Sequence, residues 1–160
     1  MAADCFLKIE GIDGESEDAN HKGEIEVLSW SWGASQPASM ATGSGGGSGK
    51  VNMQDFSFSF RNGKASPKLM LACAKGKHIK SAVFTCRKAG GDQEEFLVFT
   101  LSDCIVSSYQ TGGSGGEDLP IESLTLNFAK VEMQYKPQGS DGSLGSLVKT
   151  GWDLKTNAKV

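Results

Sequence analysis

The chain has 160 residues, 22% of them charged, with a formal net charge of −3. This length is normal for one domain and buries roughly 68–70% of the unfolded surface, so the core requires neither a metal nor a disulfide. The negative charge disfavours nucleic acid as a partner, and no apolar run approaches the roughly 20 residues of a membrane helix, so we expect no membrane insertion.

Period-2 alternation predicts strands over 4–10, 24–35, 51–61, 79–89, 95–109 and 121–136. One helix is predicted over 66–75, with Ser66 as N-cap, Pro67 at the first helical position and Gly76 just past the end. Leu69, Ala72 and Cys73 share one face of that helix, which is enough to lie on a sheet. The 21 glycines, about twice the usual share of roughly 7%, indicate many tight turns and one or two open loops.

The apolar phase shifts by one residue within three of these strands. In 24–32, Ile25 and Val27 face one way, whereas Leu28, Trp30 and Trp32 face the other. In 51–60, the alternation of Val51 and Met53 gives way to that of Phe56, Phe58 and Phe60. In 121–136, the alternation of Leu124, Leu126 and Phe128 gives way to that of Val131, Met133 and Tyr135. A β-bulge produces such a shift and bends the strand, and long bent strands let a sheet close or fold into two halves. We therefore predict a mainly β fold: a small, closed or nearly closed barrel of two packed antiparallel sheets with one flanking α-helix. A strand that changes sheets would give the same pattern.

The glycine-rich segment ATGSGGGSGKV, residues 41–51, invites comparison with a phosphate-binding loop. Such a loop needs Gly, four residues, then Gly-Lys and Ser or Thr, followed by a helix. Counting back from Gly49-Lys50 places Ser44 where the first glycine belongs, and Val51 follows the lysine. A strand pattern comes next instead of a helix. No nucleotide site and no cofactor are expected here.

No catalytic set and no metal site emerge from the rest of the chain. Ser114 lies in GGSGG, a literal match to G-x-S-x-G, but a nucleophile elbow needs a helix directly afterwards, and a turn and strand follow. For His21, in a polar turn, and His78, before a strand, a solvated or structural role is favoured. The acidic cluster at 14–20 lacks the spacing of a calcium loop.

The four cysteines, at positions 5, 73, 86 and 104, form no C-x-x-C pair. Each has apolar or strand-like neighbours. We expect buried free thiols that act as small hydrophobic side chains.

Five stretches, taken together and in order, resemble the Hcp proteins, the inner-tube subunits of bacterial type VI secretion systems. They are KGEIEVLSWSWG (22–33), GSGKVNMQDFSFSF (47–60), RKAGGDQEEFLVFTL (87–101), VSSYQTGGSGGEDLPIESLTLNFAKVEMQYKPQ (106–138) and GWDLKTN (151–157). The resemblance runs through nearly the whole chain, as one domain over 1–160. Segment 139–148 and the cysteines are its least typical parts.

The resemblance implies homo-hexameric rings that stack into a hollow tube inside a contractile sheath, below a puncturing tip. Effectors would travel in the ring lumen, where the tube protein acts as carrier and chaperone in protein secretion and virulence. The N-terminus, MAADCFLKIEG, lacks a basic region and a long apolar region. We therefore expect folding in the bacterial cytoplasm and secretion without a signal peptide.

Two sets of site residues follow from the resemblance. It implies that the extended glycine-rich loop 36–50 projects from the ring and touches its neighbour, through Ser39, Met40, Thr42, Ser44, Ser48 and Lys50. If Trp30 and Trp32 point into the core, alternation places Ser29 and Ser31 on the opposite face. The resemblance suggests that this face lines the channel; the alternative is that both serines cover an exposed sheet face.

Two other functions stay open at this point. A small β-barrel with a glycine-rich loop suits a monomeric ligand-binding protein, which native mass would separate from a ring. A tube protein with a fused toxin domain is disfavoured, because the chain ends at Val160 with no extra domain.

Overall fold

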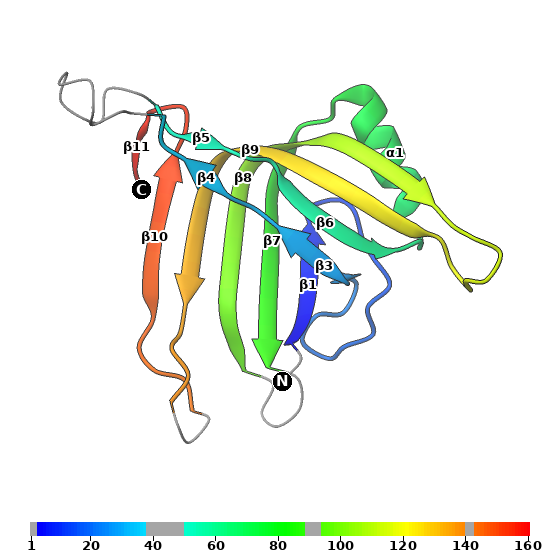
Figure 1. Cartoon of the computed structure of the whole chain (residues 1–160), viewed down its shortest axis with the longest axis horizontal. Helices are drawn as coiled ribbons and strands as arrows, with labels where there is room; N and C mark the ends of the chain where they lie inside the picture. Colours follow the sequence, from blue (N-terminus) through cyan, green and yellow to red (C-terminus); the bar gives the residue numbers. More distant parts are fainter. Residues whose placement is uncertain (1–2, 38–49, 89–93, 140–142) are drawn as a thin grey trace.

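The computed structural model describes residues 3–37, 50–88, 94–139 and 143–160. These residues form eleven strands and one helix, arranged as in Figure 1. In chain order they are β1 (Ala3–Ile9), β2 (Ile25–Val27), β3 (Ser29–Ser31), β4 (Ala34–Ser35), β5 (Asn52–Met53), β6 (Phe56–Arg61), α1 (Ser66–Lys75), β7 (Ile79–Lys88), β8 (Glu95–Gly112), β9 (Ile121–Tyr135), β10 (Val148–Asp153) and β11 (Ala158–Lys159).

Nine strands form one antiparallel sheet that folds back over itself. The order is β11-β10-β9-β8-β7-β1-β2, while β6 pairs with the first half of β9 and carries β3 on its other edge. Strands β4 and β5 form a separate two-stranded ribbon. In Figure 1, β3 and β6 cross in front of the upright β7 and β8. The mainly β fold with one flanking helix is confirmed, but β2 and β3 do not pair, so the described sheet is not closed into a barrel.

The long strands β8 and β9 change layers together at one bend. Leu101 faces Val131, and Cys104 faces Phe128, and all four are buried. In each strand, the two successive inward-facing residues at the bend are therefore three positions apart, whereas regular alternation would place them two apart. Asp103 lies in the bend with a φ of 54°, a conformation in which Asp is over-represented among non-glycine residues. The predicted phase shift in 121–136 is confirmed, although the bulge in this strand pair lies further along β8, between Val106 and Ser108.

The other two phase shifts coincide with breaks between strands. Residues 24–35 divide into β2, β3 and β4, and 51–61 divide into β5 and β6. Trp30 turns its ring onto the core, 5.0 Å from Phe84, although 37% of the residue stays exposed. Leu28 lies at the break between β2 and β3 and is 46% exposed, so it is not part of the buried core.

An aromatic cluster fills the space between the two layers. Phe56 is fully buried at its centre, with ring centroids 5.0–6.0 Å from those of five neighbours: Trp30, Trp32, Phe58, Phe84 and Phe99. Aliphatic side chains complete the core: Leu7, Ile9, Ile25, Leu69, Ile79, Leu101, Val106, Leu124, Leu126 and Val131.

The helix α1 covers the predicted residues and packs on β8. Gly76 ends it in the left-handed conformation, with a φ of 59°, as expected for a C-terminal glycine. The N-cap, however, is Ala65, not Ser66. Ser66 instead links two other segments to the helix. Its Oγ accepts a hydrogen bond from the Gly63 N–H at 3.1 Å and donates one to Glu122 Oε1 at 2.5 Å.

Candidate functional site

The outward side of β3, β6 and β9 is covered by small hydroxyl side chains. The register aligns Ser29 with Ser59 and Ser123 in one row, and Ser31 with Ser57 and Thr125 in the next. These residues point outward because Trp30, Phe58 and Leu124, which alternate with them, turn to the core. We call the six residues of the two rows the hydroxyl face. Ser29, Ser31 and Ser123 are exposed, and the other three are half-buried.

At one end of this face, the Asp55 carboxylate accepts hydrogen bonds from two neighbouring side chains. Ser107 Oγ donates to Asp55 Oδ2 at 2.6 Å, and Asn127 Nδ2 donates to Asp55 Oδ1 at 2.9 Å. Because the bulge puts two successive residues on one side, the hydroxyls of Ser107 and Ser108 both reach Thr125 Oγ1, at 2.7 and 2.6 Å. Asp55 therefore has defined partners and fixes the local side-chain arrangement.

The chemistry of the hydroxyl face is neutral, polar and adaptable. A hydroxyl both donates and accepts, and it rotates to suit a partner. Because these side chains are small, a molecule that binds to the face comes close to the backbone of the sheet. Ser29 and Ser31 were predicted as site residues from the sequence, whereas Ser57, Ser59, Ser123 and Thr125 were not. The alternation of apolar and hydroxyl residues in FSFSF and SLTLNF would have predicted those four on the outward face.

The glycine-rich loop starts and ends at the β4–β5 ribbon. Ala34 pairs with Met53, and Ser35 pairs with Asn52, so the two ends of the loop are held side by side. Lys50 is exposed at its end. The other predicted contact residues lie outside the described residues: Ser39, Met40, Thr42, Ser44 and Ser48. Their role in ring stacking stays a prediction.

An apolar pocket of about 500 Å³ lies beside this ribbon. Its lining comes from β4–β5 on one side and from β9 and β10 on the other, and includes Trp32, Val51, Met53, Val131, Met133 and Trp152.

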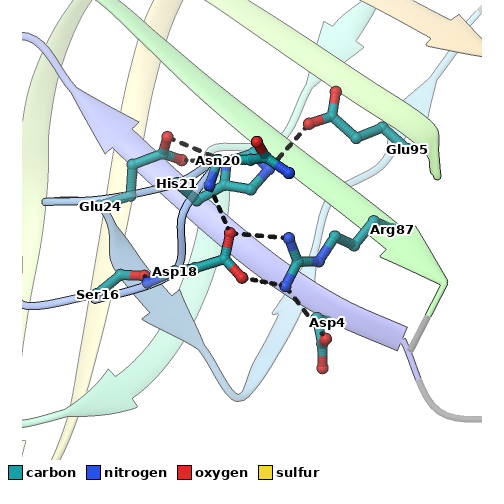
Figure 2. A network of polar contacts seen from close by, with 8 residues as sticks. All are labelled: Asp4, Ser16, Asp18, Asn20, His21, Glu24, Arg87 and Glu95. Carbon is teal, nitrogen blue, oxygen red and sulfur yellow. Dashed lines mark hydrogen bonds and ion pairs between the residues drawn. The ribbon is translucent and has the colours of Figure 1, made fainter. Parts of the chain in front are cut away.

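A second polar cluster ties the 11–24 segment to β1 and β7 (Figure 2). Arg87 is 3% exposed, and its guanidinium carbon lies 4.8 Å from the centre of the Phe6 ring. Nη1 donates to Asp18 Oδ1 at 2.9 Å, Nη2 donates to the other oxygen of Asp18, and Asp4 Oδ2 lies 3.6 Å away. The hydrogen bonds from Arg87 are the main cause that lowers the pKa of Asp18 to about 2.

His21 belongs to the same cluster and stacks on the Phe6 ring. Its ring is parallel to that of Phe6, with centroids 4.4 Å apart, and the residue is 5% exposed. Nδ1 lies 3.0 Å from both carboxylate oxygens of Glu24. Nε2 lies 2.8 Å from Glu95 Oε1 in an ion-pair contact without hydrogen-bond geometry. His21 is therefore a buried structural residue rather than a solvated one, and the cluster is a clamp on the 11–24 segment.

Replacing Asp18 with asparagine is expected to loosen this clamp in a pH-dependent way. The folded-state pKa of Asp18 lies below its ordinary value of 3.8, so its contribution to stability is fully present above about pH 4. That contribution is lost as the pH falls towards 2. Amide exchange of Gly14, Ser16 and Gly23 is expected to accelerate in the variant at pH 6. The difference in melting temperature from wild type is expected to shrink between pH 5 and pH 2; a difference that grows on acidification would contradict the clamp.

The remaining predicted positions belong neither to the hydroxyl face nor to the clamp. Ser114 is exposed in the connection between β8 and β9, with a strand after it, as expected. His78 is exposed, with Nε2 3.0 Å from Asp103 Oδ1. Within the described ranges, no three His, Cys, Asp or Glu side chains are grouped so as to hold a metal ion. Nor does any helix there have the length and apolarity that crossing a membrane requires.

Comparison with known proteins places these features in a family. The family model described as "Type VI secretion system effector, Hcp" matches residues 6–135. Protein hcp1 of Pseudomonas aeruginosa is 53% identical over 162 residues, with both chains covered completely. A solved type six secretion system protein is 34% identical, with a TM-score of 0.94 over 99% of this chain and 100% of its own. Hcp1 from Salmonella typhimurium is 39% identical, with a TM-score of 0.81 over the same shares of the two chains. The chain therefore belongs to the Hcp family of type VI secretion effector and tube proteins.

Proposed function

We propose that the protein forms homo-hexameric rings that stack into the inner tube of a type VI secretion machine, with the hydroxyl face lining the channel. The observation that carries this proposal is the pairing of family membership with two aligned rows of outward hydroxyls on a rigid sheet. The sheath would surround the tube and the tip would cap it. Effectors in the lumen would be carried and protected until ejection.

The hydroxyl face suits a channel wall that must hold cargo and then release it. Ser29 and Ser31 offer hydrogen bonds without bulk, so the channel stays wide and wettable. The six side chains of the two rows are themselves uncharged, and the nearest carboxylate, Asp55, is engaged by Ser107 and Asn127. Individual hydrogen bonds that compete with water contribute only about 0.5–1.5 kcal/mol each, which suits reversible binding.

Exposed apolar side chains at the sheet edge support assembly into rings. Tyr135 on β9 pairs with Val148 on β10, and the two are 42% and 62% exposed. Met133 and Leu147, close by in the chain, are 39% and 49% exposed. Exposed apolar patches of this kind mark interaction surfaces. A cyclic ring needs such a patch to dock onto a different patch of the next subunit.

Loop 36–50 would join one ring to the next. The β4–β5 ribbon holds Ala34 beside Met53 and Ser35 beside Asn52, which brings the two ends of the loop together. Ordering a Gly/Ser segment costs roughly 1–2 kcal/mol of backbone entropy per residue, which many stacked copies can offset together.

Replacing Ser31 with glutamine is expected to reduce cargo retention without breaking the ring. The longer side chain would project from the outward face of β3 into the space that cargo occupies. We expect unchanged ring mass and a several-fold lower level of a small type VI effector co-expressed with the protein, measured by co-purification. Ser123→Gln, on the same face, is expected to act alike, whereas Ser35→Gln, on the β4–β5 ribbon, is the matched control. Full effector recovery with Ser31→Gln and Ser123→Gln would remove the cargo role of this face.

The apolar pocket beside the β4–β5 ribbon supports a second candidate function. Its volume of about 500 Å³ and its tryptophan and methionine lining suit a small apolar ligand. A monomeric ligand-binding protein would use this pocket and would need no ring, so native mass separates the two functions.

A further inference from the structure

Two of the four cysteines face each other across neighbouring strands. Cys5 on β1 is the direct partner of Cys86 on β7, and the two are 81 positions apart in the sequence. Their Sγ atoms lie 2.8 Å apart, and either thiol can donate a hydrogen bond to the other. Val27 lies opposite Cys5, and Leu97 lies opposite Cys86, so the sulfurs belong to a row that runs across four strands.

We propose that Cys5 and Cys86 form a redox site, which closes to an intramolecular disulfide when the protein meets an oxidising environment. A secreted type VI protein leaves a reducing cytoplasm, where such thiols stay reduced, for an exterior where disulfides persist. The bond would link β1 to β7 and fasten the N-terminal strand to the sheet.

The backbone geometry already fits such a bond. Directly opposite residues in antiparallel strands have Cα atoms about 4.5–5.5 Å apart, within the roughly 4.4–6.8 Å that disulfides span. The pairing of β7 with β8 shifts register between Cys86 and Arg87, so the strand is irregular beside one sulfur and can adjust there.

The two thiols differ in access and in acidity. Cys5 is half-buried and lines an open pocket of about 300 Å³ with Asp4, Val27 and Leu28. Cys86 is 2% exposed. The hydrogen bond from Cys86 lowers the pKa of Cys5, against the opposing effects of burial and of Asp4. The hydrogen bond to Cys5 and burial raise the pKa of Cys86. Cys5 is thus the thiol that an oxidant reaches first, and Cys86 is the one that resolves the intermediate.

Oxidation by a small disulfide, such as oxidised glutathione, gives a balanced reaction. The Cys5 thiolate attacks one sulfur of glutathione disulfide, which breaks that bond and releases one glutathione thiolate. Cys86 gives up its proton, and its sulfur attacks the Cys5 sulfur and expels the second glutathione thiolate. Two protein thiols are oxidised to one disulfide, and one glutathione disulfide is reduced to two molecules of glutathione.

The other two cysteines serve as internal controls. Cys104 is fully buried, and burial, with a smaller effect of Asp103, raises its pKa to about 12. Cys73 lies half-buried on α1. In the described part of the chain, neither makes a hydrogen bond to another cysteine.

The test treats fully reduced protein with excess oxidised glutathione and then counts free thiols after denaturation by maleimide labelling and mass spectrometry. Two of the four thiols are expected to disappear, with peptide mapping joining residue 5 to residue 86. The melting temperature is expected to rise by about 5–10 °C, because the bond constrains the unfolded chain. Cys73→Ser is expected to behave like wild type, while Cys5→Ser is expected to form no link and to show no rise.

Four free thiols, a persistent glutathione adduct on Cys5, or links only between chains would overturn the proposal. Because this assay involves neither ring assembly nor secretion, such a result would leave the proposed tube function unaffected.

Discussion

Replacing Phe56 with alanine is expected to lower the free energy of unfolding by about 3–5 kcal/mol, the range for a large-to-small change in a core. Phe56 is fully buried and its ring meets five others, so truncation leaves a cavity that rigid aromatic neighbours cannot fill. Denaturant unfolding at a fixed protein concentration measures the change, since assembly adds to apparent stability.

Phe60→Ala is the matched control for this change. Phe60 is on the same strand and 1% exposed, but no aromatic ring contacts it in the described part of the chain. Aromatic pairs add about 0.5–1.5 kcal/mol beyond the area that they bury. Phe56→Ala is therefore expected to cost at least about 1 kcal/mol more than Phe60→Ala. Equal losses would mean that the ring contacts contribute nothing beyond burial.

Replacing Glu122 with leucine is expected to cost about 3 kcal/mol or more, because it leaves the buried Ser66 hydroxyl and the half-buried Asn62 and Tyr109 donors without their acceptor. Glu122 is 1% exposed and accepts hydrogen bonds from Ser66, Tyr109 and Asn62, which join α1, β8 and the segment after β6 to β9. Glu122→Gln keeps the shape and part of the bonding, and is expected to cost about half as much.

The same carboxylate predicts a pH dependence. Burial raises the pKa of Glu122, but the hydrogen bonds from Ser66, Tyr109 and Asn62 outweigh that effect and leave the pKa below its ordinary value of 4.5. Its contribution to stability is therefore present above about pH 4.5 and declines as the pH falls below it. The gap in melting temperature between wild type and Glu122→Gln is expected to narrow between pH 6 and pH 3. A constant gap would contradict an ionised Glu122.

Local signals explain which elements the sequence predicted well. Helix α1 was predicted over the observed residues because Pro67 and Gly76 mark its two ends through backbone conformation alone. The buried Phe56, Phe58 and Phe60 follow from strict alternation in β6. The strand breaks at Leu28 and before Phe56 were visible as phase shifts, although a phase shift does not distinguish a bulge from a break.

The elements that were missed have no such local signal. Strand β10 is mostly exposed, and its residues VKTGWD do not alternate. It joins the sheet through backbone pairing with β9. Gly151 is needed there because an added Cβ would lie 2.9 Å from the Glu132 side chain and 3.0 Å from the Val131 carbonyl oxygen. That crowding exists only once the two strands are paired.

The candidate site depends on long-range register in the same way. Alternation placed Ser31 on the outward face, but only the pairing of three strands aligns it with Ser57 and Thr125. The Cys5–Cys86 pair depends equally on the register of β1 with β7. Such residues can be named one by one from the sequence, but their proximity depends on strand pairing between distant segments.

Native mass tests the proposed tube function most directly. Gel filtration coupled to light scattering, at micromolar protein concentration, is expected to give a single species of six times the 16.9 kDa chain. Electron micrographs of that species are expected to contain six-fold rings with an open channel. A uniform 16.9 kDa species without rings would contradict the proposal and would favour the monomeric ligand-binding protein.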